Sequence, residues 1–175
     1  KKLTFDGIRY LEELEEPNKN SKKIFVAFNF NKRLKRIFNN NLKEAIEFEG
    51  LEYVVVNQDN VEHNKYINDE IIVKLKAARI VIADVTNHRN SVYFEAGFAM
   101  GMNIPVIWTC QKKDKDNMAF DINQFPHIVW KDKDDLVDEF NEFLFDYTSK
   151  ISLEDIKQAK KEIQKDELDK IQSPY

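Results

Sequence analysis

The sequence predicts an α/β protein, in which helices cover both faces of a parallel sheet of about five strands and a further helix follows at the C-terminus. Short apolar runs alternate with longer segments whose apolar residues recur at helical spacing, and the alternation repeats about four or five times. The 175 residues are 42% hydrophobic, which suffices for the core of one compact domain.

Each strand is predicted from a short run of consecutive apolar residues, a pattern typical of strands that are buried on both faces. Each helix is predicted from apolar residues three and four positions apart. Gly50 follows the first helix, where a left-handed residue would end it. These elements define a Rossmann-like, or flavodoxin-like, sheet. The predicted strands are 24–28, 53–56, 80–83, 105–108 and 127–130, and the predicted helices are 31–49, 66–79, 91–102 and 134–147.

The chain is predicted to contain three parts. Residues 1–20 form a strand, a turn and a short helix, followed by a linker. Residues 21–149 form the main domain, and residues 150–175 form a polar helix with a thin apolar stripe. That stripe is too narrow for a deeply buried helix, so the last helix is either a solvated surface helix or a subunit contact.

Composition and spacing exclude several classes of protein. The single cysteine, Cys110, excludes a disulfide framework and a Cys-rich zinc site, and favours the cytoplasm. No apolar run approaches the roughly 20 residues that span a bilayer, and a net charge of −4 argues against nucleic-acid binding by bulk charge. Neither GxGxxG nor a P-loop motif occurs, which argues against a standard dinucleotide-binding fold and against a P-loop enzyme. The spacing of Asp59, His63 and Asp69 matches no zinc or calcium signature, so no metal is predicted.

Two carboxylates indicate where chemistry would occur. Ligands of an open parallel sheet bind beyond the carboxyl ends of its strands. Asp84 ends the third apolar run, and a helix starting near Asn90 would place Glu95 about 7.5 Å along its axis, so the two carboxylates are predicted to converge on one pocket. Such a pair is suited to glycosyl transfer. Alternatively, Asp84 caps the following loop and Glu95 is a surface glutamate, although its apolar neighbours make that position costly. Asn90 or Ser91 would donate hydrogen bonds that keep Glu95 charged.

The segment after the first strand supplies further candidates. Phe28 could stack on a base or belong to the core, while Asn29 and Asn31 are placed to touch a sugar. Lys32 belongs to a run of eight Lys or Arg, without Asp or Glu, between Lys19 and Lys43. This run could bind the phosphate of a nucleotide or of NAD, or it could be a solvated face.

Three residues that follow the third strand add further expectations. His88, in the loop after that strand, could approach a leaving base. Gly97 and Gly101 lie four residues apart on the helix that carries Glu95. Because glycine weakens a helix interior, the pair suggests either close approach of a backbone or ligand, or tight packing against the sheet.

Five separated segments carry a resemblance to a known family: Phe25–Phe28, Ile80–Thr86, Asn90–Ala99, Pro105–Ile107 and Phe120–Trp130. In this order, over about residues 23–147, they resemble the nucleoside 2-deoxyribosyltransferase-like superfamily. In that superfamily the glutamate that matches Glu95 attacks the anomeric carbon of a nucleoside, and the aspartate that matches Asp84 holds or protonates the substrate. The expected substrate-binding residues in these segments also include Asn90, Ser91, Tyr93 and Asp121. The resemblance implies no metal or other cofactor, and a homo-oligomer.

The pairing of Glu95-Ala96-Gly97 with the segment 120–130 is similar to deoxyribosyltransferase-like effectors of bacterial anti-phage systems, including retron toxins. This similarity implies a toxin with a possible protein or nucleic-acid partner in a defence complex. Residues 3–14 resemble the last strand and helix of a winged-helix module that often precedes such domains. The aromatic-rich helix and the long C-terminal helix depart from free-standing transferases, which favours hydrolysis over base exchange.

We therefore predict an N-glycosidase that cleaves the N-glycosidic bond of a small nucleoside, nucleotide or NAD-like substrate, with Glu95 as nucleophile. Two alternatives remain at this level. A TIR-like NAD hydrolase shares the alternating fold and a catalytic glutamate, and a non-catalytic nucleotide-binding module would signal through assembly.

Overall fold

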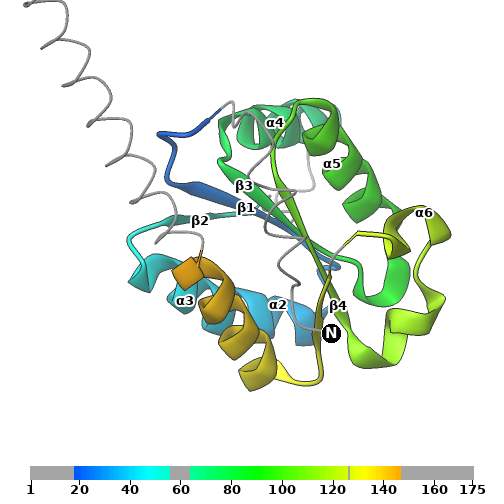
Figure 1. Ribbon diagram of the computed structural model, residues 1–175. Coiled ribbons are helices and arrows are strands. Elements are labelled where there is room, and N and C mark those ends of the chain that lie inside the picture. The colour runs from blue at the N-terminus through cyan, green and yellow to red at the C-terminus, as the bar shows by residue number, and fades with distance from the viewer. Residues whose placement is uncertain (1–17, 56–63, 126, 147–175) are drawn as a thin grey trace, which may run out of the picture. The chain divides into compact units, whose positions relative to one another are not determined.

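The computed structural model describes residues 18–55, 64–125 and 127–146, so the elements expected at 3–14 and 150–171 lie outside the described residues. The chain divides into two compact units, residues 1–140 and 141–175, and the sheet belongs to the first. Among the described residues, five parallel strands form one sheet in the order β2-β1-β3-β4-β5 (Figure 1). The predicted fold class is confirmed. The strands are β1 (Lys23–Ala27), β2 (Glu52–Val54), β3 (Ile80–Asp84), β4 (Val106–Gln111) and β5 (His127–Trp130).

The strand order contains a switch point between β1 and β3. From β1 the chain moves outward to β2, and it then returns to the other side of β1 to build β3, β4 and β5 in succession. At such a point the connections leave neighbouring strands in opposite directions, which opens a crevice at the carboxyl ends. The loops after β1 and β3 therefore flank the place where a ligand is expected.

A continuous helical run covers one face of the sheet (Figure 1). It comprises α2 (Lys32–Arg36), the π-helical η1 (Ile37–Leu42) and α3 (Lys43–Phe48), and Gly50 follows with φ of 72°, as expected for a helix end. In an α-helix, residues four apart drift by about 40° around the axis at each step. The wider π turns offset this drift and keep the buried side chains on one side. Those side chains are Leu34, Phe38, Leu42 and Ile46.

The opposite face is covered by α4 (Asn64–Ala77) and α5 (Asn90–Gly101) (Figure 1). Its core contains alternate residues of β3, Val81 and Ala83, packed with Val92 and Ala96 of α5. Because side chains alternate across a strand, Asp84 belongs to the other face of the sheet. None of the described helices has the length and apolar character needed to cross a membrane.

The region from β4 to β5 contains more structure than its sequence pattern predicts. β4 continues through Thr109 to Gln111, although the apolar run predicts an end at Trp108. The extension forms because Thr109 pairs with Asp84 of β3 and Gln111 with Trp130 of β5, so neighbouring strands complete its ladder. Between β4 and β5, where no helix is predicted, the chain forms a 3₁₀ segment, η4 (Lys112–Asn117), followed by α6 (Phe120–Asn123). A further helix begins at residue 133, close to the expected 134.

Gly97 and Gly101 lie on the exposed side of α5. Among the described residues, no heavy atom outside the helix lies within 4 Å of a Cβ placed at either position. Neither tight packing against the sheet nor close approach of another part of the described backbone explains these two glycines.

Substituting Gly97→Ala should therefore stabilise the protein by about 0.5–1 kcal/mol, because alanine restricts the unfolded chain and adds no clash. Urea-induced unfolding measures the change. Gly50→Ala is the matched control and should destabilise by about 1–2 kcal/mol, since its φ of 72° disfavours a Cβ. A destabilised Gly97→Ala variant would show that something outside the described residues packs against this side of α5.

Candidate functional site

The candidate site lies at the carboxyl edge of the sheet, where the switch point brings the ends of β1 and β3 side by side. A short 3₁₀ turn, η3 (Thr86–His88), connects β3 to α5. Asn87 and His88 adopt left-handed φ values of 62° and 51°. Such a conformation costs about 1–3 kcal/mol at a residue other than glycine, and it tends to occur where a loop is held for function. The turn determines where α5 begins and therefore where Glu95 lies.

Glu95 is a buried carboxylate with few partners. Its side chain is 8% exposed on α5, three residues after Val92 and four before Ala99, on the side of the helix that faces the core. Within the described part of the chain, no hydrogen bond to its carboxylate is found. Burial raises the pKa of Glu95 to about 7, and the charge of Arg89 opposes that shift. The group is therefore close to half ionised near neutral pH and keeps its acceptor positions for another molecule.

Arg89 is the residue near Glu95 that the sequence pattern does not single out. It immediately precedes α5, and its Nε donates a hydrogen bond to Ser91 Oγ at 3.1 Å. Ser91 Oγ accepts this bond, and no bond from Ser91 or Asn90 to Glu95 is found among the described residues; Asn90 is exposed at the first position of the helix. The expectation that these two donors keep Glu95 charged is not met. The positive charge of Arg89 lowers the pKa of Glu95 instead.

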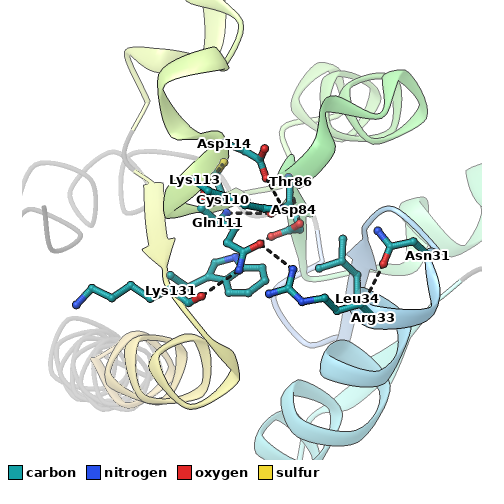
Figure 2. A network of polar contacts seen from close by, with 11 residues as sticks. Asn31, Arg33, Leu34, Asp84, Thr86, Cys110, Gln111, Lys113, Asp114 and Lys131 are labelled. Carbon is teal, nitrogen blue, oxygen red and sulfur yellow. Dashed lines mark hydrogen bonds and ion pairs between the residues drawn. The ribbon is translucent and has the colours of Figure 1, made fainter.

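Asp84 has a very different environment, drawn in part in Figure 2. Its carboxylate is completely buried. Oδ2 accepts from Thr109 Oγ1 at 2.7 Å and from Trp130 Nε1 at 2.9 Å, and Oδ1 accepts from the backbone N–H of Thr86 at 3.2 Å. Burial raises the pKa of Asp84 to about 6, against the effect of these hydrogen bonds. The carboxylate joins the ends of β3, β4 and β5 and also caps the loop after β3, which was the alternative expectation.

The two carboxylates approach this edge from opposite faces of the sheet. Asp84 points to the face of the sheet that α2 and η1 cover, whereas Glu95 belongs to α5 on the opposite face. Neither carboxylate contributes to the pKa shift of the other. Both residues lie at the carboxyl edge of the sheet, as their positions after the third strand predict, and the alternation of side chains along β3 directs Asp84 to the other face.

The residues after β1 are mostly used by the fold. Phe28 is 1% exposed, with its ring stacked on Phe38 at 4.6 Å and tilted against Phe30 at 4.5 Å, so its ring belongs to the core. Asn31 Oδ1 accepts from the backbone N–H of Leu34 and caps α2. The half-buried Asn29 has its carbonyl bonded to the N–H of Asn31. Among these three residues, only the side chain of Asn29 has no role in the fold that the described contacts show.

The remaining candidates lie around this edge without contacting Glu95. Lys32 is exposed at the start of α2. Tyr93 lies two residues from Glu95, about 200° around the helix, so it points to the other flank of α5. There its hydroxyl lies 2.9 Å from His88 Nδ1 and accepts from the backbone N–H of Ala119. Asp121 is exposed on α6. Among the described residues, no group of three or more His, Cys, Asp or Glu is arranged to hold a metal ion.

Comparisons with known proteins add little to this geometry. No family model matches the chain, and no curated protein matches it. Among solved structures, the chain is similar to a 2-desoxiribosyltransferase from Leishmania mexicana, with a TM-score of 0.45 and 19% sequence identity. The match covers 56% of this chain and 74% of the other. A likeness at this level carries no information on activity, and the fold class rests on the parallel sheet itself.

Proposed function

We propose that this protein is an N-glycosidase that cleaves the bond between a base and a sugar in a nucleoside, nucleotide or NAD-like small molecule, with Glu95 as the nucleophile. The observation that carries the proposal is the state of the Glu95 carboxylate. It is buried beside the switch point of a parallel sheet, and within the described residues it accepts no hydrogen bond. A largely buried carboxylate whose charge is offset mainly by Arg89 is costly to keep, which favours a role in chemistry.

The reaction uses the carboxylate as an electron-pair donor. An oxygen of Glu95 forms a bond to the anomeric carbon while the bond from that carbon to the base nitrogen breaks, and the electron pair leaves with the base, which takes up a proton. Water then attacks the anomeric carbon of the ester, which releases the sugar and returns the carboxylate. Burial favours the first step, because a poorly solvated carboxylate stabilises the positive charge that develops on the sugar.

Arg89 keeps part of the Glu95 population ionised. Removing this positive charge should raise the pKa of Glu95, since Arg89 lowers it in the native protein. The rate should therefore rise with pH through about 7 in the wild type, and Arg89→Gln should move that rise to higher pH. Profiles of kcat/KM against pH measure the shift. Arg36→Gln, an exposed change on α2, is the control; an unmoved profile for Arg89→Gln would contradict the assignment of Glu95 as the ionising group.

The substrate class is tested by incubating the protein separately with nucleosides, nucleoside monophosphates and NAD, and measuring released base by mass spectrometry. Release of a base from at least one class is expected. Preferred release of nicotinamide from NAD would identify an NAD-like substrate, and binding without release would contradict the glycosidase and favour a signalling module.

The sequence resemblance further supports an effector role in anti-phage defence, in the cytoplasm and as a homo-oligomer. Growth arrest on expression of the wild type but not of Glu95→Gln tests the effector role, and light scattering tests the oligomer.

A further inference from the structure

We infer that Arg33 is a phosphate-binding residue at the carboxyl edge of the sheet, so that the substrate is a nucleotide or a dinucleotide instead of a free nucleoside. The nature of the substrate rests on the proposed function. The phosphate contact itself rests on the surroundings of Arg33.

Arg33 is an exposed cation that is held by a neutral group. It is the second residue of α2, and its Nη1 donates to Gln111 Oε1 at 2.9 Å, with the guanidinium directed at Gln111 in Figure 2. Within the described residues no carboxylate pairs with Arg33, and no further partner of its guanidinium is found. Its charge therefore stays uncompensated, and most of its five N–H donors remain available.

Gln111 is fixed in the orientation that this contact needs. Its side chain is buried, with 5% exposed. Nε2 donates to the carbonyl of Lys131 at 3.0 Å, and the backbone N–H of Gln111 donates to Thr86 Oγ1 at 2.9 Å. Because the NH₂ group is engaged by a carbonyl, the amide oxygen must face Arg33. A buried, oriented amide thus positions an exposed guanidinium before any ligand arrives.

Stability alone does not account for this arrangement. An exposed cation in a surface contact contributes little to folding, and a cation in the first turn of a helix is disfavoured by the helix dipole. No Asp or Glu occurs between Lys19 and Lys43, so the local field around α2 is positive. Preorganised guanidinium groups of this kind bind phosphate oxygens through two parallel hydrogen bonds.

The position of Arg33 relates it to Glu95. α2 follows β1 and α5 follows β3, and these two strands are neighbours at the switch point. Gln111 ends β4, the next strand along. A ligand that lies across the carboxyl ends of these strands would present its sugar toward one helix and its phosphate toward the other. The 5′-phosphate of a nucleotide and the pyrophosphate of a dinucleotide share this chemistry.

Isothermal titration on a Glu95→Gln background, which is not expected to turn over substrate, tests the inference. A nucleoside, its 5′-monophosphate, NAD and inorganic pyrophosphate are the probes. Arg33→Ala should weaken binding of the phosphorylated probes by at least about tenfold, the value of one hydrogen bond to a charged group, and change nucleoside binding by less than about twofold. The monophosphate and NAD arms identify the source of the phosphate.

Two further variants sharpen the result. Arg36→Ala removes an equally exposed cation from the same helix and should alter binding by less than about twofold. Gln111→Glu gives up the bond to the Lys131 carbonyl but supplies a carboxylate that pairs with the Arg33 guanidinium, so phosphate binding should weaken although the cation is still present. Thermal unfolding of each variant confirms that it is folded.

The outcomes separate the inference from the proposed function. Equal losses for Arg33→Ala and Arg36→Ala, or a loss of nucleoside binding as large as the loss of nucleotide binding, would overturn the phosphate subsite. Arg33-dependent binding of pyrophosphate or of the monophosphate, without base release by the wild type, would support the subsite and contradict the glycosidase. Base release by the wild type, together with phosphate binding that is unchanged in Arg33→Ala, would support the glycosidase and contradict the phosphate subsite.

Discussion

Glu95→Gln should reduce base release by about 10³-fold or more, because glutamine has nearly the shape of glutamate but cannot form the glycosyl ester. Single-turnover assays with excess enzyme are the appropriate measurement, since they report the chemical step without product release. Glu44→Gln is the matched control: Glu44 is exposed on α3, and its removal should leave the rate within about twofold. A Glu95→Gln variant with wild-type activity would remove Glu95 from the mechanism.

The same substitution should stabilise the protein, in a manner that depends on pH. Burial raises the pKa of Glu95 from 4.5 to about 7, so the folded state binds this proton more tightly than the unfolded state does. The stabilising contribution of the protonated Glu95 side chain to the free energy of unfolding is fully present below about pH 4.5 and is lost as pH rises through about 7. At pH 8 the ionised carboxylate costs up to about 3 kcal/mol.

Glu95→Gln removes that cost, so its free energy of unfolding should exceed that of the wild type at pH 8 and approach it at pH 4.5. Urea unfolding at the two pH values measures the difference. A variant that is both inactive and more stable at high pH would show that the native protein keeps a strained carboxylate for function. An unchanged difference between the two pH values would contradict the buried state of Glu95.

Asp84→Ala should destabilise the protein by about 3–5 kcal/mol, which is comparable to the whole stability of many domains. The substitution leaves Thr109 Oγ1, Trp130 Nε1 and the N–H of Thr86 without their acceptor in a fully buried site. Each unsatisfied buried donor costs about 1–3 kcal/mol. Urea unfolding at low temperature measures the loss, and Asp116→Ala, an exposed change in η4, is the comparison and should cost less than about 1 kcal/mol.

A double-mutant cycle would show whether this loss comes from the network. Trp130→Phe removes one donor from the carboxylate, so the double substitution with Asp84→Ala should cost less than the sum of the two single changes. Additive effects would show that Asp84 acts on stability through other contacts.

Asp84→Asn retains one acceptor oxygen and should fold at low temperature. If that folded variant loses as much activity as Glu95→Gln, Asp84 acts on the substrate as the sequence analysis expects; activity within about tenfold of the wild type would assign it to the structure.

Much of the fold follows from local sequence. Consecutive apolar residues in 24–28 and 80–83 leave few arrangements other than strands covered on both faces, and β1 and β3 lie there. The spacing of Leu34, Phe38, Leu42 and Ile46 identified the first helix, and Gly50 marked its end. Parallel order then requires that the strand ends share one edge, so Asp84 and the start of α5 were correctly assigned to that edge.

The order of the elements, the edge at which the site is proposed and the presence there of Glu95 can therefore be predicted from the sequence. How each polar side chain at that edge is used depends on the tertiary structure. Thr109 and Gln111 become strand residues because β3 and β5 complete their ladder, and Asp84 is engaged by donors 25 and 46 residues away. Such partners depend on strand order and on which face of the sheet a side chain takes. Neither is encoded in the local pattern, which is why two carboxylates eleven positions apart lie on opposite faces of one sheet.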